Sequence, residues 1–174
     1  MVVLLAVVLA SCSSKYKTDS FDPPPQPLSS SGTAYVMMPR DGSYGGRIYD
    51  GSGRTVSQLL YSAISTRLKS AELSPAPESR DQALAKARSK NISYVFETTI
   101  LNWEDRATQW SGRPDRITIK IDVWDTATGR NLASSLERAS SKWFTFGGDH
   151  PQDLVPRMMK TFSDRLFRGQ RHSL

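Results

Sequence analysis

Residues 116–123 read Arg-Ile-Thr-Ile-Lys-Ile-Asp-Val, and this stretch decides the fold class. Ile117, Ile119, Ile121 and Val123 fall on one face of an extended chain, because successive side chains in a strand point to opposite faces. Polar side chains occupy the other face. This alternation is typical of a sheet that packs one face on a core and exposes the other to water.

Two further strands are expected on either side of this one in the sequence. Residues 92–103 are rich in β-branched and aromatic side chains, which favour strands. Residues 132–143 return after the segment Asp125-Thr126-Ala127-Thr128-Gly129, whose glycine suits the hairpin position that needs a positive φ. The second half of the chain therefore predicts three strands in succession.

Strand and helix patterns alternate in the first half. Residues 34–38 predict a buried strand that Pro39 stops, and residues 72–76 predict a second, short strand. Two capping boxes predict helix starts, one from Thr55 to Gln58 and one from Ser79 to Gln82.

A final helix is expected to carry the apolar residues from Leu154 to Leu166. Asp153 is its expected N-cap, and Pro156 is tolerable only within the first turn. The expected order is β-α-(β)-α-β-β-β-α. We therefore predict an α/β (α+β) fold, in which a mixed β-sheet is packed with about three helices.

The N-terminal residues predict an exported precursor. Val2–Leu9 form a short apolar run, well below the roughly 20 residues that span a bilayer as a helix. The run leads into Leu9-Ala10-Ser11-Cys12, which ends in the only cysteine of the chain. We interpret residues 1–11 as a signal peptide. A positively charged start is missing before Val2, so we expect translation to begin upstream of Met1.

The string Leu9-Ala10-Ser11-Cys12 resembles the lipobox of bacterial lipoproteins. This resemblance implies cleavage after Ser11, and then a diacylglycerol thioether and an N-acyl chain on Cys12. Several acyl chains would give stable anchoring to a membrane. The alternative is a free, buried cysteine near an unprocessed N-terminus. Ser13, where an Asp would imply retention in the inner membrane, implies the inner leaflet of the outer membrane, with the protein facing the periplasm.

Composition divides the mature chain into three parts. Residues 12–32, with Pro23-Pro24-Pro25 and Ser29-Ser30-Ser31, contain too little apolar surface to fold. We expect them to form a flexible tether behind the lipidated Cys12. Residues 33–168 are the expected globular α/β domain, and residues 169–174 are a C-terminal tail.

Three strings in the body resemble an uncharacterised lipoprotein family of Gram-negative bacteria that has a domain of unknown function. They are residues 41–46, residues 103–115 and residues 146–154. The resemblance implies no activity. More distantly, the order of elements is similar to the N-terminal domain of the Tol translocation protein, the curli-secretion lipoprotein and lipoprotein activators of penicillin-binding proteins. That similarity implies a fold and no function.

Aromatic and arginine side chains are concentrated in two connections of the second half. The connection after residue 103 is longer than a hairpin needs, and long ordered loops are often functional. Trp and Arg frequently anchor interfaces. In the alternative interpretation the tryptophans cover the core, and Arg106 pairs locally with Asp115. The predicted partner-binding face comprises Trp103, Arg106, Trp110, Arg113, Asp115, Phe146, Asp149 and His150.

No pattern in the sequence predicts catalysis or a bound metal. Residues 51–55 before a helix lack the Lys-Ser/Thr ending of a phosphate-binding Walker loop. His150 and His172 are the only histidines, and lipidation would consume the Cys12 thiol, so a His/Cys metal site is not expected. We therefore expect no catalytic residue and no cofactor besides the covalent lipid.

The formal charge of +6 and the pI near 9.6 suit anionic headgroups or envelope polymers as contacts, although a solvated helix face explains the same lysines and arginines. Export excludes nucleic acid. We expect a non-catalytic binding or adaptor module of the cell envelope, with an envelope protein or polymer as partner. The alternatives are a subunit of a secretion or export assembly and, less favoured, a hydrolase that uses His150 with a carboxylate and a serine.

Overall fold

The computed structural model describes residues 14–105, 114–141 and 150–168. The elements, in chain order, are β1 (Lys15–Asp22), β2 (Thr33–Met38), β3 (Ser43–Tyr44), β4 (Arg47–Ile48), α1 (Ser52–Ser65), β5 (Ser70–Pro77), α2 (Arg80–Ser89), β6 (Tyr94–Glu104), β7 (Arg116–Asp125), β8 (Asn131–Ser140) and α3 (Pro151–Phe167). No helix within the described ranges is long and apolar enough to cross a bilayer.

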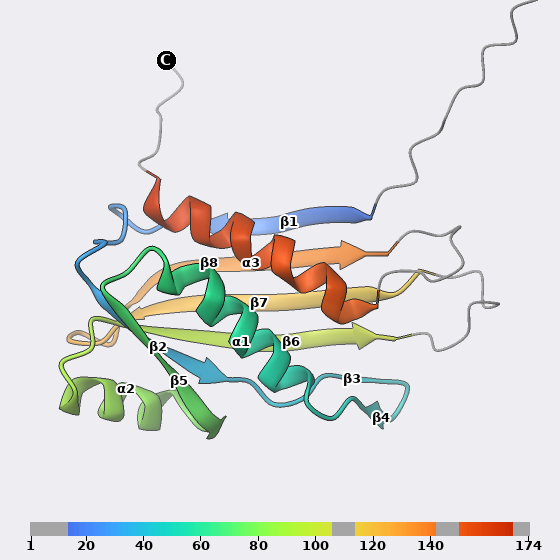
Figure 1. Ribbon diagram of the computed structural model, residues 1–174, viewed down its shortest axis with the longest axis horizontal. Helices are drawn as coiled ribbons and strands as arrows, with labels where there is room; N and C mark the ends of the chain where they lie inside the picture. The colour runs from blue at the N-terminus through green and yellow to red at the C-terminus, as the bar shows by residue number, and fades with distance from the viewer. Residues whose placement is uncertain (1–13, 106–113, 142–149, 169–174) are drawn as a thin grey trace, which may run out of the picture.

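A mixed sheet with the strand order β1-β8-β7-β6-β2-β5 forms the centre of the molecule (Figure 1). The pairs β1-β8, β8-β7 and β7-β6 are antiparallel, whereas β2 runs parallel to both β6 and β5. The predicted order is confirmed from β2 to α3. The chain adds β1 before it and the short β3-β4 hairpin within it.

The main core lies between the sheet and the helices α1 and α3. The predicted inward residues of β7 are almost completely buried there, and they pack with side chains such as Phe96 and Phe162. Burying one side chain of this size stabilises a fold by about 1.5–3 kcal/mol. A smaller cluster, which includes Tyr35, Met37 and Val95, packs under α2 on the opposite face. The part of this opposite face that α2 does not cover carries exposed polar side chains such as Lys120.

The expectation of a flexible tether over residues 12–32 is wrong from Lys15 onward. β1 pairs antiparallel with β8 along its length. Phe21 meets Phe162 edge-on with 6.4 Å between ring centroids, and the Arg157 guanidinium lies 4.5 Å from the centroid of the Tyr16 ring. Leu28 is also buried. The composition of the segment did not predict β1, because the residues with which β1 pairs lie more than a hundred positions later in the sequence. Cys12 lies outside the described residues.

Two predicted helix starts are also wrong. α1 begins at Ser52, and Gly51 precedes it with a φ of 84°, which a glycine adopts at little cost. α3 begins at Pro151, a first-turn position that suits proline. Asp153 is not its N-cap, because its carboxylate accepts from the backbone N–H of the N-cap residue His150 at 2.9 Å. Pro156 consequently lies beyond the first turn. The capping box at Ser79 is confirmed.

Candidate functional site

The parallel part of the sheet opens at the carboxyl ends of β2 and β5. The chain leaves β2 towards α1 on one face and leaves β5 towards α2 on the other, although the two strands are neighbours. Neighbouring parallel strands whose connections leave to opposite faces form a topological switch point, where α/β proteins commonly bind ligands. The geometry of the fold therefore singles out this edge.

A local separation of two strands creates a pocket at this edge. β2 pairs with β6 only as far as Val36 opposite Phe96. The chain after β2 returns to β6 at Gly42, where a methyl group would lie only 2.8 Å from Ile100 Cγ2. Between these two contacts, β6 has β7 as its only paired strand among the described residues.

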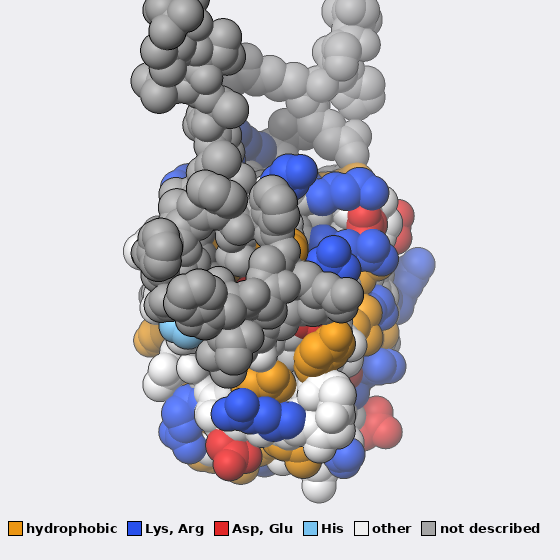
Figure 2. Space-filling model, turned by 90° about the vertical axis from the view of Figure 1, so that its right-hand side faces the viewer, with side chains coloured by type: hydrophobic (Ala, Val, Ile, Leu, Met, Phe, Trp, Pro, Cys, Tyr) orange, Lys and Arg blue, Asp and Glu red, His pale blue; other side chains and the backbone are white. Residues whose placement is uncertain are grey.

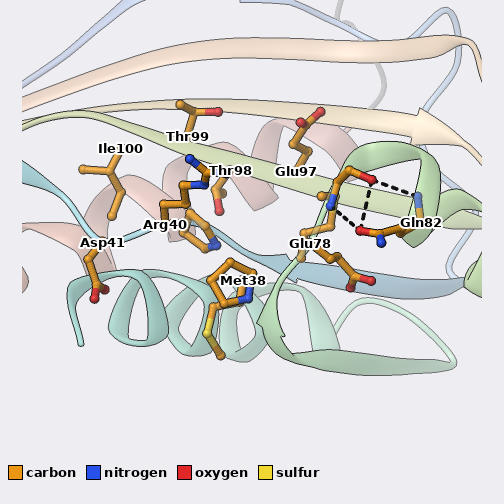
Figure 3. A pocket seen from close by; sticks show the side chains of 13 residues that line it. Met38, Arg40, Asp41, Glu78, Gln82, Glu97, Thr98, Thr99 and Ile100 are labelled. Carbon is orange, nitrogen blue, oxygen red and sulfur yellow. Dashed lines mark hydrogen bonds between the residues drawn. The ribbon is translucent and has the colours of Figure 1, made fainter. Parts of the chain in front are cut away.

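The resulting cavity has a volume of about 710 Å³, within the range of small-molecule sites. We call it the strand-gap pocket (Figure 3). Its walls come from the end of β2, the turn into α2 and the middle of β6. It is lined by Met37, Met38, Pro39, Arg40, Asp41, Pro77, Glu78, Ser79, Gln82, Glu97, Thr98, Thr99 and Ile100.

Arg40 is the cation of the strand-gap pocket, and its guanidinium takes part in no ion pair with another described residue. Figure 3 shows it lining the pocket together with Thr98 and Thr99 of β6. Thr98 is only 4% exposed, and its hydroxyl has no hydrogen-bond partner in the part of the chain that the structure describes. A buried hydroxyl without a partner is destabilising by roughly 1–3 kcal/mol. The Thr98 hydroxyl therefore lacks an acceptor among the described residues, whereas the exposed Arg40 guanidinium is open to water and to a ligand.

The carboxylates of the pocket already have donors. Glu78 accepts from Lys86 at 2.5 Å, from Tyr35 at 2.6 Å and from Ser74 at 2.7 Å. Burial alone would raise the pKa of Glu78, but these hydrogen bonds outweigh burial and lower the pKa. Glu97 accepts from Arg80 at 2.8 Å and from the Trp124 indole at 2.9 Å.

Asp41 is likewise engaged, at the N-terminus of α1. Its carboxylate accepts from the backbone N–H groups of Gly53 at 2.7 Å and Gly51 at 3.2 Å. The helix terminus next to residues 51–55 is thus capped by the protein itself. The net result is a pocket whose acids already accept hydrogen bonds from the protein and whose Arg40 has no ion pair with a described residue.

The predicted partner-binding face is only partly visible in the described residues. Trp103 is 3% exposed and belongs to the core, so it offers no surface to a partner and the core-covering alternative describes this residue. The Asp115 backbone N–H donates to the Ser141 hydroxyl at 2.9 Å, and His150 is the N-cap of α3. The remaining members, Arg106, Trp110, Arg113, Phe146 and Asp149, lie outside the described residues.

Two of these predicted residues meet a third that the sequence did not suggest. The His150 Nδ1 atom lies 3.5 Å from an Asp105 carboxylate oxygen, and possible ligand atoms of Asp105, Asp115 and His150 lie within 4.8 Å of one another. Asp115 also takes part in a further interaction. The His150 side chain is 58% exposed, which does not match the deep pocket that the hydrolase alternative requires. The expectation of no bound metal stays a prediction.

Arg40 and Thr98 were missed by reasoning from the sequence. Thr98 did carry a signal, because it interrupts the inward register of Phe96 and Ile100 with a hydroxyl. Pro39 carried another, because a proline directly after a buried strand forces the chain out of the hydrogen-bond ladder. Their proximity to each other depends on the strand order, which the sequence did not give.

Family membership follows from the sequence profile of a domain of unknown function, DUF4823, which matches residues 26–166. The chain belongs to the DUF4823 family. This confirms the resemblance to a family without an assigned function. No curated protein matches the sequence.

Solved structures share the fold of this DUF4823 protein at low sequence identity. The PelC dodecamer from Paraburkholderia phytofirmans is 14% identical with a TM-score of 0.69, covering 90% of this chain and 99% of that one. Protein XCC0632 from Xanthomonas campestris, of the DUF330 family, is 11% identical with a TM-score of 0.50, covering 83% and 87%. Lipoprotein GNA1162 from Neisseria meningitidis is 12% identical with a TM-score of 0.47, covering 76% and 96%.

Proposed function

We propose that this protein is a lipid-anchored, non-catalytic binding module of the cell envelope, and that the strand-gap pocket is its binding site. The observation that carries the proposal is the pocket itself, which lies at the switch point of the sheet. Arg40 has no ion pair there with a described residue, and the Thr98 hydroxyl has no partner among them. Its acids are held by other side chains. A pocket of this kind recognises a ligand and provides no activated nucleophile.

The anchor is the lipidated Cys12 that the lipobox implies. Only Ser13 and Ser14 separate Cys12 from the first residue of β1. Three residue steps span about 10 Å when fully extended. A lipid on Cys12 would therefore hold the sheet against the membrane surface, and not at the end of a long tether.

The end of the molecule next to this anchor is basic. Lys15, Lys17, Arg116 and Arg138 line a shallow hollow of about 340 Å³. Lys17 and Arg138 are paired with Asp19, whereas Lys15 and Arg116 have no ion pair with a described residue. Figure 2 shows Lys and Arg side chains gathered on this end. Anionic headgroups attract such residues by about 1 kcal/mol each, which supports this orientation.

The anchor is tested by Cys12→Ser. Wild-type protein should carry diacylglycerol and an N-acyl chain in mass spectrometry and should fractionate with the outer membrane, whereas the variant should lose both properties. An unmodified Cys12 in the wild-type protein would contradict the anchor.

The site is tested with a single cysteine introduced by Thr99→Cys at the pocket, and with Lys69→Cys as the control at the far end of the sheet. Lipidation leaves no other thiol in the chain, so a photoactivatable maleimide reports one position at a time. We expect envelope cross-links from position 99 that are absent from position 69. Equal cross-linking from both positions would contradict a binding role for the pocket.

A second candidate function is that of an assembly subunit. It is favoured by the fold match to PelC, which is described as a dodecamer. The sheet edges weigh against association by strand pairing, because β5 carries Pro75 and Pro77 and β1 carries two lysines and an irregular register after Thr18. Light scattering of the lipidated protein in detergent distinguishes a monomer from a ring.

A further inference from the structure

The unpaired stretch of β6 is the starting point for identifying what the strand-gap pocket binds. Four consecutive residues of β6, Glu97–Ile100, line the pocket. Alternate residues of a strand turn their N–H and C=O groups to each side, so part of this backbone faces the gap. An extended peptide can pair with such an edge, as in strand addition to an open sheet.

The charge of the pocket limits the ligand further. One arginine without a partner faces three carboxylates that are already hydrogen-bonded, namely Asp41, Glu78 and Glu97. These acids would repel a dianion such as a phosphate monoester about twice as strongly as a monoanion. A single carboxylate has one negative charge and two oxygens, which match the fork of the Arg40 guanidinium.

The Thr98 hydroxyl adds a second reason to expect an oxygen acceptor. It belongs to the same pocket lining as Arg40 and has no hydrogen-bond partner among the described residues (Figure 3). The oxygen is covered in this structure, so a ligand oxygen reaches it only if the pocket wall shifts, and it then recovers the hydrogen bond that burial removed. Met37, Met38 and Pro77 supply apolar contacts for a small side chain next to the carboxylate.

We propose that the strand-gap pocket binds the C-terminal carboxylate of an extended peptide, which pairs with the free edge of β6 and places its carboxylate on Arg40 and Thr98. This inference rests on the proposed function in one respect, that the pocket is the binding site. It adds the chemical class of the ligand and the residues that recognise it.

The test is an NMR titration of the lipidated protein in neutral detergent micelles. The probe is a mixture of tetrapeptides randomised at every position, with free carboxyl ends, and the matched probe is the same mixture with C-terminal amides. We expect shifts at Arg40 and Glu97–Ile100 with the free acids, and binding weakened about tenfold or more with the amides.

Two variants separate recognition from folding. Arg40→Gln removes the charge of an exposed side chain and should reduce binding of the free acids to the level of the amides. Arg130→Gln changes another exposed arginine, at the opposite end of the sheet, and should leave binding unchanged. Inorganic phosphate is titrated as well, and we expect it to bind more weakly than the free acids.

Several results would overturn the inference. These are equal binding of acids and amides, binding that Arg40→Gln does not alter, shifts confined to another surface, phosphate binding as tight as that of the acids, or no binding of the peptide mixture. Cross-linking from Thr99→Cys reports occupancy of the pocket by any ligand. Persistent cross-links with a failed titration would therefore reject the peptide carboxylate and leave the proposed function intact.

Discussion

Thr98 places a buried hydroxyl without a partner among the apolar inward side chains of β6. Replacing it by valine keeps the shape and removes the group that burial penalises. We expect Thr98→Val to stabilise the protein by about 1 kcal/mol, seen as a higher melting temperature. The same change should weaken binding of peptide carboxylates. Thr118→Val, on the outer face of β7, is the control and should change neither quantity. A lower melting temperature for Thr98→Val would show that the hydroxyl has a stabilising role.

Glu78 makes stability depend on pH. Its pKa is lowered in the folded protein from an ordinary value of 4.5, against the opposing effect of burial, by the donors Lys86, Tyr35 and Ser74. A carboxyl with a depressed folded pKa stabilises the fold above the unfolded pKa, and this contribution is lost as the pH falls through the folded pKa. The wild type should therefore lose stability below about pH 4.5.

Glu78→Gln should remove the pH-dependent contribution of Glu78 to the free energy of unfolding. We expect the variant to be less stable at neutral pH by about 1–3 kcal/mol, because a charged hydrogen-bond acceptor is lost. Urea unfolding at several pH values measures the difference between the two proteins, which should narrow towards acid. A difference that stays constant across the pH range would argue against the assigned titration. Asp81→Asn, on the exposed first turn of α2, is the control.

The candidate site was the part of the molecule that the sequence predicted least. The predicted face relied on an abundance of Trp and Arg, but Trp103 covers the core. The residues of the strand-gap pocket are ordinary in type, and only the departure of β2 from β6 between Val36 and Gly42 brings them together. Trp110 and Arg113 stay predictions.

At the scale of elements, local patterns were sufficient for the succession from β2 to α3. The alternation at residues 116–123 and the hairpin glycine Gly129, with its φ of 69°, describe interactions between near neighbours. β1 was missed because its evidence is distant. Its inward side chains Tyr16 and Phe21 pack against α3, which lies at the other end of the sequence, so no local pattern indicates that they are partly buried.

Phe21→Ala should report how strongly β1 is attached. The ring packs against Phe162 and lies 5.3 Å from the Arg165 guanidinium, but it is only partly buried. We expect a loss of about 2 kcal/mol in the free energy of unfolding, below the 3–5 kcal/mol typical of fully buried phenylalanines. Ser20→Ala, at an exposed neighbouring position, should have almost no effect. Equal stabilities for the two variants would mean that β1 contributes little.

Protease resistance gives an independent measure of β1. Because its backbone pairs with β8, residues 15–22 should resist cleavage under conditions that cut exposed loops. Mass spectrometry of the limiting fragment should therefore find an N-terminus before Lys15. A limiting fragment that begins near Thr33 would instead support the prediction that residues 12–32 are flexible.

At the scale of the whole molecule, the basic end next to Cys12 predicts binding to anionic vesicles even without the lipid. We expect the Cys12→Ser protein to bind vesicles rich in phosphatidylglycerol and to lose binding as salt rises, because exposed charges are screened. Adding Lys15→Glu with Arg116→Glu should abolish the binding. Adding Lys69→Glu with Arg130→Glu makes the same change in net charge at the opposite end and should have a much smaller effect.

The short connection from Cys12 to β1 also has a mechanical consequence. If a lipid on Cys12 holds the Lys15 end of the strands at the membrane, as proposed, a pull on a bound partner would load β1 along its own axis. The backbone hydrogen bonds between β1 and β8 then bear the force together, in shear, and do not open one after another. Cation-π contacts would also oppose sliding of β1 past the rest of the fold. The Arg157 guanidinium lies over the Tyr16 ring, and the Arg165 guanidinium lies over the Phe21 ring. The composition predicted a flexible tether over these residues, but as an edge strand they would make the attachment stiff.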